Sequence, residues 1–158
     1  MYQRPRLIPC LSIIDNDLVK TTQFHKPKYI GDPVNAVKIF NTKGVDELCI
    51  LDIRATENGK GPNFSLLEEI ASEAFIPLSY GGGIKSIQQA KKVFHIGYEK
   101  VIINSEFYTN GQLVSEIVKF AGSQSVVVSI DVKKKGNKHI CYYKSGTKDS
   151  GLTIEEAL

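Results

Sequence analysis

The residues of this chain that could do acid/base chemistry are carboxylates at the ends of apolar, strand-like runs. Asp52 follows the run ELCIL, and Asp131 follows VVVSI. Carboxylates at the carboxyl ends of parallel strands lie at one edge of a sheet, where they can exchange protons with a bound substrate. Two structural interpretations compete with this one. Asp52 could cap its loop or pair with nearby Arg54, and Asp131 could pair with Lys133 or Lys134.

A run of three glycines, Gly81–Gly83, separates a strand from a helix in PLSYGGGIKS. Such a connection needs at most one residue with positive φ, so three glycines indicate a close approach to the backbone. The approaching group is either another part of the chain in a tight turn or a phosphate held by backbone N–H groups. Asn104 and Ser105 end the next strand and could complete a phosphate site. Lys20, in the first polar stretch, could reach a phosphate or carboxylate, or could simply be solvated.

Charged residues also stand at the opposite, amino ends of the strands: Arg6, Glu47 and Lys100. They could form a ring of ion pairs beneath the sheet, although strand-end charges are usually solvated. We expect no metal site, because the histidines are scattered without ligand spacing, and we expect no cofactor. They are His25, His95 and His139.

The candidate site residues lie between segments that alternate as strands and helices. Apolar, continuous strand-like runs predict strands at 7–14, 47–53, 75–80, 100–104 and 125–132. Helical spacing with caps predicts helices at 33–43, 66–74, 86–94 and 113–120. Residues 133–146 predict a small hairpin, and Thr153 with Glu156 predicts a capping box.

This α/β order is typical of a parallel sheet covered by helices. The first strand–helix turn lacks G-x-G-x-x-G and a P-loop lysine, which favours a (β/α)8 TIM-barrel type over an open doubly wound sheet. A complete barrel takes about 250 residues, whereas this chain has 158. We therefore expect residues 1–158 to form the N-terminal portion of a single barrel domain, with about the first five βα units. Such a piece is either a fragment or is completed by another chain, and its exposed strand edges could pair with a second copy.

Composition narrows the class of partner. Hydrophobic residues make up 42% and charged residues 23%, with a net charge of +3. These values are typical of an ordinary globular protein. The charge is too small to argue for a nucleic-acid partner and suits small anions as well, and no apolar run approaches the roughly 20 residues that a membrane segment needs. Three widely spaced cysteines in apolar runs predict core thiols in a reducing, cytoplasmic compartment. They are Cys10, Cys49 and Cys141.

Five stretches together resemble the cyclase subunit of imidazole glycerol phosphate synthase. They are RLIPCLSIIDNDLVK, GDPVNAVKIFNTKGVDELCILDIRAT, IPLSYGGGIKS, YEKVIINS and FAGSQSVVVSIDVKKK, and the resemblance runs from about Arg6 to the end of the chain. It implies a barrel of histidine biosynthesis, with a glutaminase partner docked at the amino ends of the strands. Ammonia would pass through the barrel to a phosphorylated substrate, which it cleaves and cyclises.

The resemblance also implies roles for individual residues. Asp131 falls at the second catalytic carboxylate, and Lys20 and Asp52 at substrate-binding positions. Gly83, Asn104 and Ser105 fall at a phosphate site. The ammonia gate would contain Arg6, Glu47 and Lys100, and Glu99 would lie at the glutaminase-facing rim.

One position departs from the family pattern, because Ser12 stands where the first catalytic aspartate is expected. A serine hydroxyl does not titrate near neutral pH, and loss of such a group commonly slows a reaction on the order of 10²–10⁴-fold. The stretch KTTQFHKPKYIGDP resembles a branch found with surface-polysaccharide genes, which implies ammonia delivery to a sugar amidotransferase. The alternatives are a true cyclase in histidine biosynthesis and an inactive scaffold or truncated half-barrel.

Overall fold

The computed structural model describes residues 4–22 and 25–157. Within these residues, seven strands form one sheet in the order β3-β2-β1-β4-β5-β6-β7. The strands are β1 (Cys10–Ile14), β2 (Asp17–Thr22), β3 (His25–Gly31), β4 (Leu48–Asp52), β5 (Leu78–Gly81), β6 (Lys100–Ile103) and β7 (Val126–Val128). Strands β1, β4, β5, β6 and β7 pair in parallel, as continuous apolar runs predict.

Five α-helices follow or connect these strands, and a sixth ends the described chain. They are α1 (Pro33–Lys43), α2 (Phe64–Glu73), α3 (Ile87–Ile96), α4 (Ser105–Thr109), α5 (Gly111–Ala121) and α6 (Ile154–Ala157), with a short 3-10 turn at Ser123–Ser125. In residues 4–22 and 25–157, no helix combines the length and apolar character that crossing a bilayer requires.

Helix ends follow the capping signals of the sequence. Asp32 Oδ1 accepts the Asn35 N–H at 2.8 Å where α1 begins, and Gly44 ends α1 in the left-handed conformation. Thr153 and Glu156 form the predicted capping box: the Thr153 N–H donates to the Glu156 carboxylate, and the Glu156 N–H to Thr153 Oγ1.

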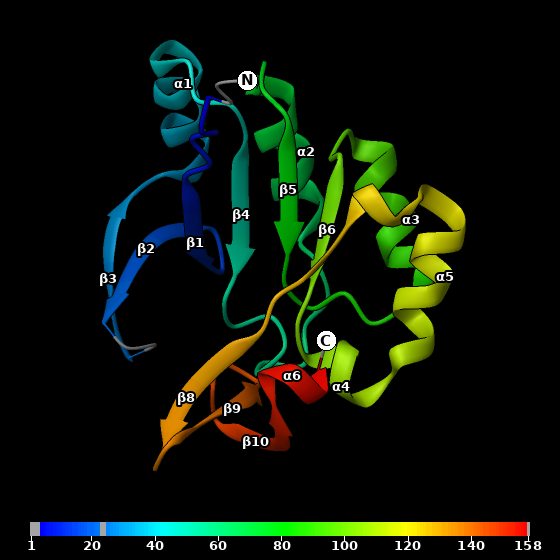
Figure 1. Ribbon diagram of the computed structural model, residues 1–158. Helices are drawn as coiled ribbons and strands as arrows, with labels where there is room; N and C mark the ends of the chain where they lie inside the picture. Colours follow the sequence, from blue (N-terminus) through cyan, green and yellow to red (C-terminus); the bar gives the residue numbers. More distant parts are fainter. Residues whose placement is uncertain (1–3, 23–24, 158) are drawn as a thin grey trace.

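The core lies between the sheet and its helices (Figure 1). Alternate strand residues point to this side, for example Leu11 and Ile13 of β1, and they pack against helix residues such as Val37 and Ile70. Because side chains alternate along a strand, the residues between them face the other side of the sheet. We call that other side the inner face. It carries the inner-face row Cys10, Cys49, Ser79 and Lys100, which are successive register partners across β1, β4, β5 and β6.

Two segments differ from the prediction. The polar stretch that contains Lys20 is not a loop but the antiparallel hairpin β2–β3, which extends the sheet beside β1. Leu18 and Val19 are buried by this pairing, and the edge of β1 is covered.

The predicted strand 125–132 is interrupted. β7 ends at Val128, and Asp131 begins β8 (Asp131–Lys135) in a second sheet with β9 (Lys138–Tyr143) and β10 (Lys148–Thr153). The predicted hairpin is therefore three strands, and they lie beyond the carboxyl ends of the parallel strands (Figure 1). Periodicity could not find the break, because the predicted run 125–132 is mostly apolar and both β7 and β8 are extended. The barrel, whole or partial, stays a prediction, since the large sheet is open at β3 and β7.

The cysteine prediction is partly wrong. Cys141 is buried in β9, but Cys10 is exposed and Cys49 is half-buried. Both lie on the inner face, which the helices do not cover. A cysteine in an apolar strand is therefore buried only if it points to the helix-covered side of the sheet.

Candidate functional site

A cavity of about 140 Å³ lies where the parallel strands end. Its walls come from the turns after β4, β5 and β6, from the segment after β7 and from the small sheet. The lining includes Asp52, Gly81–Gly83, Asn104, Ser105, Ser129, Asp131 and Ser145. The structure therefore brings together both predicted carboxylates and the predicted phosphate residues, Gly83 among them.

The three glycines are required by packing within the chain. A Cβ on Gly82 would lie 2.6 Å from the Asp52 carbonyl oxygen, and one on Gly83 would lie 2.5 Å from that of Lys60. Both glycines also have positive φ, at +133° and +66°. The tight-turn interpretation is thus sufficient to explain the glycines. The phosphate interpretation stays a prediction, because the same residues also form one wall of the cavity.

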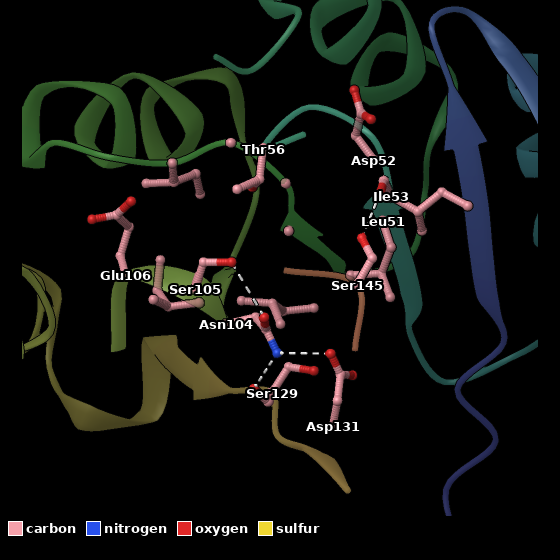
Figure 2. A pocket seen from close by; sticks show the side chains of 16 residues that line it. Leu51, Asp52, Ile53, Thr56, Asn104, Ser105, Glu106, Ser129, Asp131 and Ser145 are labelled. Carbon is pink, nitrogen blue, oxygen red and sulfur yellow. Dashed lines mark hydrogen bonds between the residues drawn. The ribbon is translucent and has the colours of Figure 1, made fainter. Parts of the chain in front are cut away.

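Asn104 organises the opposite wall. Its Nδ2 donates to the Ser129 carbonyl at 2.9 Å and to Asp131 Oδ2 at 3.5 Å, while its Oδ1 accepts from Ser105 Oγ at 3.4 Å (Figure 2). One amide side chain therefore fixes the end of β6 to the segment that carries Asp131. Burial raises the pKa of Asp131, although hydrogen bonds from Asn104 and the Gly146 backbone and the charge of Lys133 oppose the effect.

Asp52 lies on another side of the cavity and has a structural role as well. Its Oδ1 accepts the backbone N–H groups of Arg54 at 3.1 Å and Ala55 at 2.9 Å, so it caps its own loop as the structural interpretation predicted. Burial raises the pKa of Asp52, and these two hydrogen bonds oppose that rise. Both aspartates are therefore shifted toward the protonated form, which suits groups that hold and transfer a proton.

Ser12 and Lys20 do not line this cavity. Ser12 lies within β1 and not at its end, on the inner face, and its register partner Leu51 does line the cavity. Lys20 is exposed on β2, opposite Lys28 of β3. β1 continues past Ser12 through Ile14, where it pairs with β2.

A second cluster lies at the amino ends of the strands. Glu47, immediately before β4, is 3% exposed. Its Oε2 accepts from the Arg6 guanidinium at 2.9 Å and from Lys100 Nζ at 2.5 Å. We call these residues the charged cluster. Glu99, the next rim residue, is exposed beside it.

Sequence reasoning missed the contribution of the small sheet. Ser145, in the turn between β9 and β10, donates to the Ile53 carbonyl at 3.2 Å (Figure 2). The neighbouring Lys144 N–H donates to Ser105 Oγ at 3.3 Å. Ser145 is 92 residues from Ile53 in the chain. Ser145 has a positive φ of 54°, which its residue type does not predict. No sequence pattern could have found its role, because only the fold places this turn over the cavity.

The arrangement can bind an anion and move a proton. Hydroxyls, an amide and backbone groups surround the cavity together with two carboxylates whose pKa values are raised by burial. Residues 4–22 and 25–157 contain no group of three or more His, Cys, Asp or Glu placed to hold a metal ion.

The sequence of this chain is similar to a known protein family and to several named proteins. The family described as histidine biosynthesis protein matches residues 6–158. The chain is 47% identical over 155 residues to a Leptospira borgpetersenii protein provisionally named imidazole glycerol phosphate synthase subunit HisF, covering 97% of this chain and 61% of that protein. It is 48% identical over 147 residues to a Pseudomonas aeruginosa protein provisionally named as subunit hisF2, covering 92% and 59%.

A further relative is the imidazole glycerol phosphate synthase subunit HisF of Dictyoglomus thermophilum, 39% identical over 152 residues. This match covers 96% of this chain and 60% of that protein. The chain therefore spans about three fifths of the length of the curated relatives it matches.

Proposed function

Because the chain belongs to the family of histidine biosynthesis proteins, we propose that it acts in a cyclase-like subunit of the imidazole glycerol phosphate synthase type. In this proposal a glutaminase partner releases ammonia at the amino ends of the strands. The ammonia crosses the inner face to an acceptor at the carboxyl ends. The observation that carries the proposal is the pairing of the charged cluster at one end of the inner face with the anion-sized cavity at the other.

The charged cluster suits passage of ammonia but not of ammonium. Two cations contact one carboxylate oxygen, so the cluster has a formal charge of +1. A positive constriction repels ammonium, whereas neutral ammonia has no net charge to be repelled. Glu47 is buried, and Lys100, at the start of β6 in the inner-face row, reaches it.

The cavity would hold the acceptor. We assign the glycine run, Asn104 and Ser105 to a phosphate group of that acceptor, and Asp52 and Lys20 to substrate binding. Asp131 would hold and transfer a proton, and Asn104 would orient its carboxylate. The burial that raises the pKa of Asp131 supports this role, since a general acid must keep its proton until the reaction needs it.

The residue at position 12 decides which acceptor of ammonia we propose. It is on the inner face, but it brings a hydroxyl where a cyclase of this family would bring a second carboxylate. We therefore propose that ammonia goes to a separate sugar amidotransferase of surface-polysaccharide synthesis, which amidates a sugar acid. The alternative is a true cyclase of histidine biosynthesis, which the name of the Dictyoglomus relative favours.

The test measures cyclase turnover by the native gene product at high ammonium concentration without glutaminase. Ser12→Asp and Ser12→Asn are measured in parallel, since Asn has nearly the same shape but no ionisable group. No turnover in the native protein, with turnover gained only in Ser12→Asp, supports ammonia delivery to another acceptor. Turnover in the native protein at a rate typical of enzymes would overturn that proposal in favour of the true cyclase.

A second measurement addresses the partner. Glutaminase activity is measured with and without this protein, using a glutaminase encoded beside it. Stimulation that is lost in Arg6→Met, whose side chain is largely exposed, but kept in Lys133→Met supports docking at the charged cluster. An unchanged glutaminase rate, together with no turnover in any variant, would favour the inactive scaffold.

A further inference from the structure

Two thiols lie side by side on the inner face. Cys10 of β1 and Cys49 of β4 are register partners, and their Sγ atoms are 3.6 Å apart. Neighbouring strands are about 4.8 Å apart, which falls within the Cα separation of roughly 4.4–6.8 Å found for disulfides. The backbone therefore already holds the two cysteines close enough for a covalent bond.

The two thiols differ in access and in reactivity. Cys10 is exposed, whereas Cys49 is half-buried. The hydrogen-bonding contact with Cys49 lowers the pKa of Cys10 to about 7, and burial opposes this effect. The same contact and burial raise the pKa of Cys49, as does the charge of nearby Glu47. At neutral pH, Cys10 is thus the thiolate that reacts first, and Cys49 is the thiol held next to it.

We propose that Cys10 and Cys49 form an oxidant-sensitive pair, which a peroxide converts into an intramolecular disulfide. The Cys10 thiolate attacks one oxygen of hydrogen peroxide, and the O–O bond breaks. Cys10 becomes a sulfenic acid, and the leaving hydroxide takes a proton to become water. The Cys49 sulfur then attacks the Cys10 sulfur and loses its proton. The S–O bond breaks, and a second water leaves.

The electrons balance in this sequence. The two thiols lose two electrons and two protons, and hydrogen peroxide gains them to give two molecules of water. A dithiol reductant reverses the change by thiol–disulfide exchange. The modification does not depend on the proposed function, but it would tie β1 to β4 in the inner-face row that ends at Lys100.

The experiment treats the reduced chain with hydrogen peroxide at pH 7, then denatures it and alkylates the remaining free thiols. We expect the intact mass, measured before alkylation, to fall by two hydrogen atoms, and two of the three cysteines to escape alkylation afterwards. Peptide mapping should find Cys10 linked to Cys49 within one chain, and dithiothreitol should restore both thiols.

Two variants control the interpretation. Cys141→Ser removes the buried thiol of β9 and should leave the cross-link unchanged. Cys49→Ala should abolish the cross-link, let dimedone trap a sulfenic acid on Cys10, and slow alkylation of Cys10 at pH 7 several-fold. The proposal is overturned if Cys10 and Cys49 stay fully alkylatable, if Cys10 proceeds to sulfinic acid without a cross-link, or if the disulfide joins two chains.

Discussion

Replacing Lys100 by methionine should destabilise the chain strongly, because it leaves a buried carboxylate short of a partner. Glu47 has a side chain only 4% exposed, and Lys100 Nζ lies 2.5 Å from its Oε2. Methionine keeps the length of the side chain but removes the charge. Breaking a buried ion pair on one side costs about 3–5 kcal/mol. Arg6 still contacts the same oxygen, so we expect the lower end of this range, about 3 kcal/mol.

Arg6→Met is the matched comparison. The Arg6 side chain is 57% exposed, so its pair with Glu47 is screened by water, and its loss should cost under about 1 kcal/mol. The double variant Glu47→Gln/Lys100→Met removes both charges and should recover most of the stability lost in Lys100→Met.

The assay is urea unfolding followed by circular dichroism, with thermal unfolding as a check. A loss of about 3 kcal/mol corresponds to a fall of roughly 6–12 °C in Tm for a chain of this size. Equal small losses in Lys100→Met and Arg6→Met, or no recovery in the double variant, would refute the reasoning.

Two further predictions concern the cavity. Burial raises the pKa of Asp131, so the folded chain holds this proton more tightly than the unfolded chain does. The stabilisation from the protonated carboxyl is fully present below the unfolded pKa of about 3.9 and is lost as the pH rises through the folded pKa. The stability of Asp131→Asn relative to the native chain should therefore increase as the pH rises above about 4, and a constant difference in urea midpoint would contradict this. Gly82→Ala should cost about 2–4 kcal/mol, because its φ is +133° and the new Cβ would meet the Asp52 carbonyl at 2.6 Å. Gly136→Ala, with φ +62° and nothing within 4 Å, should cost only about 1 kcal/mol, and equal costs in urea unfolding would show that the close contact is unimportant.

The sequence predicted the elements best where the signals are local. α1 begins after Asp32 and ends at Gly44 as its caps indicate, since capping bonds join residues only three or four apart. The hairpin β2–β3 was missed because its apolar residues are few and its stability comes from pairing with β1. The break between β7 and β8 was missed because two extended segments read alike whether or not they belong to one sheet.

The candidate site was predicted in part for the same reason. Asp52, Asn104 and Asp131 were found because polar residues after apolar strands share one end of a parallel sheet. Ser129 and Ser145 were not found, since neither stands at a strand end that the pattern marks. The glycine run was noticed, but its main physical cause, the close approach of Asp52 and Lys60, depends on how the loops pack.

The sequence by itself determined the alternation of strands and helices, the helix caps and the edge of the sheet that gathers polar side chains. These follow from periodicity and from hydrogen bonds between near neighbours, which any stretch of chain carries with it. Only the tertiary structure decided that Glu47 is shared by Arg6 and Lys100, 41 and 53 residues away, and that Cys10 meets Cys49. Strand register and the choice of face fix such contacts, and both are set by burial of the whole core rather than by any local segment.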